Sequence, residues 1–318
     1  MIGESPFAHL RPTTTPEMLD RAYTVVVRFW PVLLGGAALY GSDHLLPLIA
    51  PLLRLGSGSD PWRVGVTLSL ALLGDFAAAI ALLAVFQGLI FPLRPISPKA
   101  ILRTALRKFP GYFLSHLAYV IIVAFGALTA WAFLQAWYFK GQSGGQLSAG
   151  IATAAATFYC GIRFSLAAIA CLIEDGTPFS SFRRSWQLTM AWPRRASFRQ
   201  KERPVLRWVA TVLLPVAIGV CVVMIGYGIG VFWMGVSPPG SAAAARAAAV
   251  APPGVVPSTT VMMEAIAFCG VCLALPFYWA GLMAIYVEYR MRREALDFYL
   301  RIRELSREVD SNYAAESS

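Results

Sequence analysis

The chain has 318 residues, of which 57% are hydrophobic and only 14% are charged, and its formal net charge is +10. A soluble domain carries roughly 25% charged and 45–50% apolar residues, so this composition excludes a soluble globular protein. The basic residues lie beside apolar stretches, which favours a role in membrane topology and contact with anionic lipids over nucleic-acid binding.

Several apolar stretches reach the length of about 20 residues that a membrane-spanning helix needs. We therefore predict an all-α, polytopic membrane helix bundle. Its six transmembrane helices should lie at about 23–41, 62–92, 110–138, 148–173, 205–235 and 259–288. The segment from Glu288 to Asp310 should continue the last span as a helix, within a cytoplasmic C-terminal part at 289–318.

A short phrase precedes three of these stretches: Ser or Thr, then Pro, then Arg five residues after the Pro. The prolines, about 80 residues apart, are Pro16, Pro98 and Pro178. Ser and Thr cap helices and Pro is tolerated at the first helical position, so each phrase should begin a helix. We predict one integral membrane domain made of three repeats, at about 15–92, 97–173 and 177–288. Chance similarity is the alternative, since Ser5-Pro6 with Arg11 fits the phrase without a span of its own.

Each repeat should consist of an interfacial amphipathic helix followed by a helical hairpin. The segments 97–109 and 177–192 carry apolar residues on one face and basic or polar residues on the rest. Such helices lie in the headgroup plane with the apolar face down. The alternative is that both segments are extensions of the neighbouring spans.

Most of the 27 Lys and Arg residues fall on one side of the predicted topology. Positively charged loops stay in the cytoplasm, so both termini are expected there. Basic residues are densest around and after the third phrase, where they could bind an anionic lipid or a protein partner, or could serve orientation alone. These candidate residues are Arg183, Arg184, Arg194, Arg195, Arg199, Lys201 and Arg203.

Ionisable residues inside a membrane usually face the helix bundle and pair with one another. Asp75 and Arg163 both fall inside predicted spans and could form an intramembrane pair, whereas Glu264 lies near an outer edge where it could be solvated. The Asp75–Arg163 pair is open to two interpretations, an interhelical tie or part of a proton or ion relay.

Catalytic motifs are missing from the sequence. It contains no H-E-x-x-H, G-x-S-x-G or P-loop pattern, and its three histidines are scattered. The pair Cys269 and Cys272 has no second cysteine pair or nearby histidine to complete a metal site. We therefore expect no enzymatic activity, no cofactor, no metal and no nucleic-acid partner.

Two segments, TPFSSFRRSWQLT and YVEYRMRREALDF, give the chain a family resemblance. It resembles the membrane-domain family named after glycerophosphoryl diester phosphodiesterase, and related uncharacterised six-span bacterial inner-membrane proteins. The residues that match the family phrases are Glu174, Pro178, Arg183, Ser185, Leu188, Thr189, Tyr289, Arg290, Arg292, Arg293, Glu294 and Asp297. Some relatives carry a phosphodiesterase domain after the spans. This chain ends at Ser318, so that activity is not expected here.

The resemblance implies a multi-pass protein of the bacterial cytoplasmic (inner) membrane. The basic loops, together with the missing catalytic groups, favour a non-enzymatic protein that binds anionic lipid or a membrane or cytoplasmic protein partner, in envelope or lipid homeostasis. The alternative function is a small-solute or lipid transporter or channel subunit, because repeats and a charged pair near the midplane also occur in transporters.

Overall fold

The structure is a computed structural model that describes residues 14–45, 61–91, 97–140, 144–174, 176–190 and 258–316, with isolated positions between 208 and 226. All regular elements in these residues are helical, which confirms the all-α prediction. Among them, four helices are long and apolar enough to cross a membrane: Val64–Ile90, Pro98–Tyr138, Gly145–Glu174 and Met262–Met291. A bent helix pair at the start of the chain would raise the number to five.

The predicted fifth span, 205–235, lies largely outside the described residues. Six spans and threefold repetition therefore stay predictions. The chain forms two compact units, and each is described by itself. The first comprises Met1–Arg21, Phe86–Trp208 and Leu282–Ser318, and the second comprises Ala22–Val85 and Val209–Gly281.

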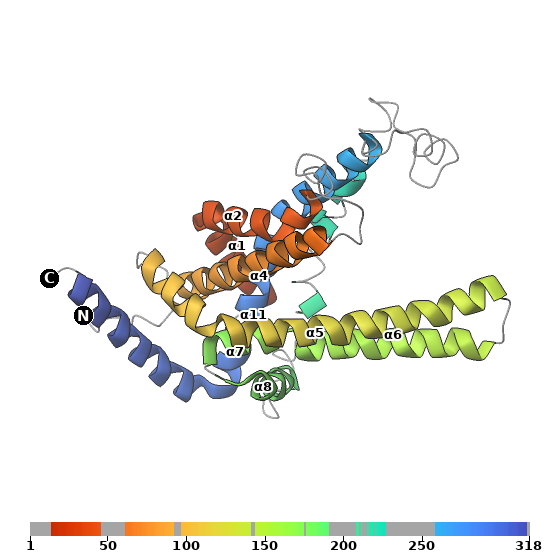
Figure 1. Cartoon of the computed structure of the whole chain (residues 1–318). Helices are drawn as coiled ribbons and strands as arrows, with labels where there is room; N and C mark the ends of the chain where they lie inside the picture. The colour runs from red at the N-terminus through yellow and green to blue at the C-terminus, as the bar shows by residue number, and fades with distance from the viewer. Residues whose placement is uncertain are drawn as a thin grey trace. The chain divides into compact units, whose positions relative to one another are not determined.

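The first unit is built on a long helical hairpin. Helix α5 (Pro98–Lys140) and helix α6 (Gly144–Phe164) lie side by side in Figure 1. The short helix α7 (Ala167–Glu174) packs against α5, and α8 (Pro178–Met190) packs against α5, α6 and α7. Figure 1 shows α8 nearly end-on, so its axis runs across the axes of α5 and α6.

The second unit contains α2 (Trp30–Tyr40), the 3-10 turn η1 (Gly41–Leu45), most of α4 (Pro61–Ile90) and the first part of α11 (Ser258–Glu316). Small residues let these helices approach closely, as is common in membrane proteins. At Gly36 of α2, an added Cβ would lie 3.4 Å from the Trp279 ring and 3.5 Å from the Ala77 carbonyl oxygen.

The first predicted span, 23–41, is broken in the structure. Helix α1 (Thr15–Arg28) ends before Phe29, and α2 begins at Trp30 with a bend of 86° between them. Pro31 stands in the first turn of α2. Proline has no N–H, and its ring clashes with the carbonyl four residues earlier, which favours a break in the helix at this point.

The three predicted helix starts are confirmed. Helix α1 begins at Thr15, α5 at Pro98 and α8 at Pro178. The Ser97 hydroxyl accepts a hydrogen bond from the Ala100 N–H at 3.4 Å, and the Thr177 hydroxyl accepts one from the Ser180 N–H at 3.3 Å. Both hydroxyls thus satisfy backbone donors that a helix start leaves open.

The expectation of a separate interfacial helix over 97–109 is wrong, because this segment continues into the helix that follows it. Helix α5 runs for 43 residues with Pro110 inside it, and Figure 1 shows it bending towards its N-terminal end. A proline inside a helix costs one hydrogen bond but bends the helix rather than ending it where neighbouring helices hold both halves. The C-terminal extension is confirmed, because α11 continues beyond the last span to Glu316.

Gly74 of α4 offers a test of the packing in the second unit. A Cβ at Gly74 would lie 2.9 Å from the Tyr40 Cα atom, so we expect Gly74→Ala to lower the free energy of unfolding by about 1–3 kcal/mol. Gly65→Ala in the same helix is the matched control, since nothing lies within 4 Å of its added Cβ. Thermal unfolding in detergent measures both. Equal melting temperatures for the two variants would contradict the close α2–α4 approach.

Candidate functional site

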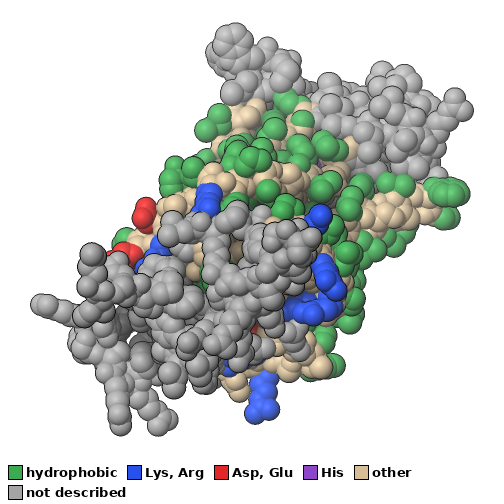
Figure 2. Space-filling model, turned by 90° about the vertical axis from the view of Figure 1, so that its left-hand side faces the viewer, with side chains coloured by type: hydrophobic (Ala, Val, Ile, Leu, Met, Phe, Trp, Pro, Cys, Tyr) green, Lys and Arg blue, Asp and Glu red, His purple; other side chains and the backbone are tan. Residues whose placement is uncertain are grey.

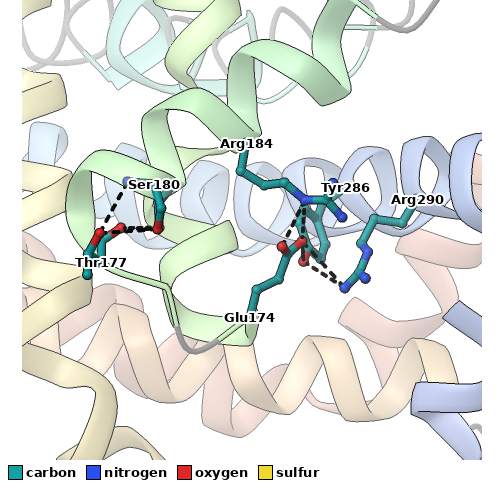
Figure 3. Close-up of polar contacts among 7 residues, drawn as sticks. Glu174, Thr177, Ser180, Arg184, Tyr286 and Arg290 are labelled. Carbon is teal, nitrogen blue, oxygen red and sulfur yellow. Dashed lines mark hydrogen bonds and ion pairs between the residues drawn. The ribbon is translucent and has the colours of Figure 1, made fainter. Parts of the chain in front are cut away.

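Four side chains from three helices meet around one carboxylate in the first unit (Figure 3). Glu174, the last residue of α7, accepts hydrogen bonds from the Arg184 Nε atom of α8 at 2.8 and 3.1 Å. Its Oε1 atom also accepts one from the Tyr286 hydroxyl of α11 at 2.7 Å and lies 3.4 Å from an Arg290 guanidinium nitrogen. Arg290 in turn donates to the Tyr286 hydroxyl at 3.3 Å.

This group, which we name the Glu174 cluster, is nearly closed to solvent. Tyr286 is fully buried, and the side chains of Arg290 and Glu174 are 5% and 15% exposed. Charges can be held in such a place only when they are paired and hydrogen-bonded. The cluster contains no nucleophile–base pair, and its geometry is that of a tie that joins α7, α8 and α11.

A second set of polar contacts closes the break between α6 and α7, which falls at Ser165 and Leu166. The Ser185 hydroxyl of α8 donates to the Arg163 carbonyl oxygen at 2.6 Å and accepts from the Leu166 N–H at 3.2 Å. The Thr189 hydroxyl lies 3.4 Å from the same carbonyl oxygen, but its shortest hydrogen bond is to the Ser185 carbonyl at 2.9 Å. Backbone groups freed inside an apolar region must find such partners, so α8 makes the break possible.

The Arg163 side chain lies at this break against aromatic rings. Its guanidinium carbon is 4.8 Å from the centre of the Tyr159 ring and 5.5 Å from that of the Trp186 ring. Phe164 packs against Trp186 at 5.6 Å and against Phe182 at 5.2 Å. Arg163 belongs to the first unit and the half-buried Asp75 to the second, so the predicted Asp75–Arg163 pair stays a prediction.

Exposed apolar and basic side chains alternate where α5 and α8 begin. The Phe179 side chain of α8 is 89% exposed one turn before the exposed Arg183. On α5, exposed leucines adjoin exposed arginines in the same way, and Figure 2 shows Lys and Arg side chains beside hydrophobic ones. We name these residues the basic interfacial surface: Leu102, Arg103, Leu106, Arg107, Phe179 and Arg183.

The other candidates separate into three groups. Arg184, predicted to bind lipid, is committed to Glu174, and the family-motif residues Glu174 and Arg290 meet in one cluster. Pro178 is the first residue of α8, and Ser185 bonds to the α6–α7 break. The remaining candidates, or their side chains, lie outside the described residues: Arg194, Arg195, Arg199, Lys201, Arg203, Arg292 and Glu294.

The position of Glu264 near an outer edge had suggested that it could simply be solvated, but its side chain has a partner. Its Oε2 atom lies 3.0 Å from the Nδ1 atom of His44, and both side chains are about one-third exposed. Among the described residues, no group of three His, Cys, Asp or Glu side chains could hold a metal ion.

No family model matches the chain, and neither the curated proteins nor the solved structures compared with it include a similar one.

Proposed function

We propose that this chain is a non-enzymatic, multi-pass protein of the bacterial cytoplasmic membrane that binds anionic phospholipids. The observation that carries the proposal is the basic interfacial surface, where Phe179 lies one turn before Arg183 and Leu106 adjoins Arg103 and Arg107. A membrane surface fits this alternation, because the apolar side chain can enter the acyl region while the guanidinium reaches the headgroups.

The direction of α8 supports the same function. Helix α8 crosses the α5–α6 hairpin in Figure 1, and an interfacial helix next to spanning helices would run in this way. Each basic residue near an anionic leaflet contributes about 1 kcal/mol. In this proposal six helices span the membrane and both termini are cytoplasmic. The arginines that follow α8 in the sequence then add to the positive charge on the cytoplasmic side, and the family resemblance remains part of the proposal.

Lipid retention by the full-length protein tests the proposed function. We expect the purified protein to be enriched in phosphatidylglycerol and cardiolipin relative to the host membrane. Replacing Arg103, Arg107 and Arg183 by Gln should reduce this enrichment at least about tenfold, from about 1 kcal/mol per residue. The same substitutions at Arg194, Arg195 and Arg199 should add to the loss, and quantitative lipid mass spectrometry measures both.

Arg63→Gln is the control, since Arg63 lies on the opposite side of the predicted topology. Its lipid content should match that of the wild type. Unchanged lipid content in the triple variants would contradict lipid binding. If a protein co-purifies with the wild type but not with the triple variants, the basic interfacial surface binds a protein partner instead of lipid.

A further inference from the structure

The Arg163 side chain has hydrogen-bonding capacity that the fold does not use. A guanidinium group carries five N–H donors in its plane. The Tyr159 and Trp186 rings beside it lie at 82° to one another, so at most one of them can cover a face of the guanidinium. Within the described part of the chain, no residue accepts a hydrogen bond from the Arg163 side chain or forms an ion pair with it. The residue is half-buried, so it is still partly accessible to an anion.

The position of this guanidinium is fixed by its surroundings. The Ser185 hydroxyl donates to the Arg163 carbonyl at 2.6 Å, so the backbone cannot easily rotate at the break. Trp186, over which the guanidinium lies, also contacts the Tyr159 ring at 6.0 Å. A cation that is already oriented binds a planar or tetrahedral oxyanion at little cost in conformational entropy.

The depth of Arg163 in the membrane follows from the length of α6. This helix has 21 residues, and at 1.5 Å per residue it is about 31 Å long, which matches the hydrocarbon thickness of about 30 Å. We take α6 alone, and not the whole apolar stretch Gly145–Glu174, as the part that crosses the hydrocarbon. Arg163, the second-last residue of α6, then lies at the membrane surface where α8 crosses. Tyr159 and Trp186 then occupy the interfacial level that Tyr and Trp prefer.

We propose that Arg163, together with Tyr159 and Trp186, forms a binding site for the phosphate group of one phospholipid molecule. The guanidinium would donate to phosphate oxygens, and the two rings beside it would contact the upper part of an acyl chain. This site deepens the proposed function but differs from it in selectivity. A phosphate group is common to zwitterionic and anionic phospholipids, so the Arg163 site should bind both.

Native mass spectrometry of the full-length protein in detergent can test the site by titration with phosphatidylglycerol and, separately, phosphatidylcholine. We expect Arg163→Gln to weaken the tightest bound molecule of each lipid by about tenfold or more. Arg163→Lys keeps the charge but loses the planar guanidinium, so its affinity for each lipid should lie between that of the wild type and that of Arg163→Gln. The control, Arg63→Gln, should leave the binding of both lipids unchanged, because Arg63 lies on the opposite side of the predicted topology.

Thermal unfolding of each variant shows whether weaker lipid binding comes from a lost site or from a destabilised fold. If Arg163→Lys has wild-type stability but binds lipid more weakly, the site is supported. Wild-type affinity of Arg163→Gln for both lipids would overturn it. If inorganic phosphate displaces the bound lipid as effectively as the same concentration of free lipid does, the ligand of the site is not a phospholipid. A non-additive stability effect of Asp75→Asn and Arg163→Gln would also overturn it, by assigning the guanidinium to Asp75.

The two proposals fail in different ways. If the wild type prefers phosphatidylglycerol, but Arg163→Gln binds phosphatidylcholine as the wild type does, the Arg163 site is wrong and the proposed function stands. If the wild type binds both lipids equally through Arg163, the site is supported and the anionic selectivity of the proposed function is contradicted.

Discussion

Replacing Glu174 by Ala should lower the free energy of unfolding by about 3–5 kcal/mol, the range found when one partner of a buried ion pair is removed. The substitution takes the carboxylate away from Arg184 and from the nearly buried Arg290, and it removes the acceptor of the Tyr286 hydroxyl. Because Glu174 joins α7 to α8 and α11, the loss should also reduce lipid retention by the basic interfacial surface. Thermal unfolding of the full-length protein in detergent measures the stability effect.

Two further variants identify the cause. Glu174→Gln keeps an oxygen acceptor for Tyr286 and should cost less than Glu174→Ala. Glu264→Gln is the matched control for losing a paired carboxylate, and its cost should stay below about 1 kcal/mol because the His44–Glu264 pair is about one-third exposed. If Glu174→Ala and Glu264→Gln melt alike, the Glu174 cluster does not hold the three helices together.

The local parts of the fold could be predicted from the sequence because local chemistry decides them. A Ser or Thr before Pro supplies a cap and a preset backbone angle, and the helices begin where Pro98 and Pro178 indicate. Apolar length alone located the four helical stretches that are long and apolar enough to cross a membrane, which lie in α4, in α5, in α6 with α7, and in α11. The sequence also indicated that Pro110 lies near a boundary. However, whether a proline ends a helix or only bends it depends on neighbouring helices.

The contacts between distant residues could not be predicted in the same way. Tyr286 and Glu174 are 112 residues apart in sequence, and no periodicity or spacing connects them. The family phrases contain Glu174 and Arg290, but they do not say that Arg184 faces that carboxylate rather than a lipid. The predicted span 148–173 contains a break at Ser165 and Leu166, which only the hydroxyl of Ser185 on another helix makes tolerable.

Replacing Ser185 by Ala should therefore lower the free energy of unfolding by about 2 kcal/mol or more, since each buried backbone group left unsatisfied costs about 1–3 kcal/mol. The Arg163 carbonyl would keep only its longer contact with Thr189, and the Leu166 N–H would lose the hydroxyl that accepts from it. Hydrogen exchange at the Leu166 amide should accelerate by the factor that corresponds to the lost stability. This amide becomes accessible to solvent when the structure around the α6–α7 break opens locally.

Ser115→Ala is the matched control for this experiment. Like Ser185, Ser115 is fully buried, but its hydroxyl has no hydrogen-bond partner among the described residues. The same change of side chain should leave stability within about 0.5 kcal/mol or raise it, because it removes a polar group that makes no compensating contact. If Ser185→Ala is as well tolerated as Ser115→Ala, and the Leu166 amide stays protected, α8 does not stabilise the break. Arg163 would then lose the fixed backbone on which its phosphate site depends.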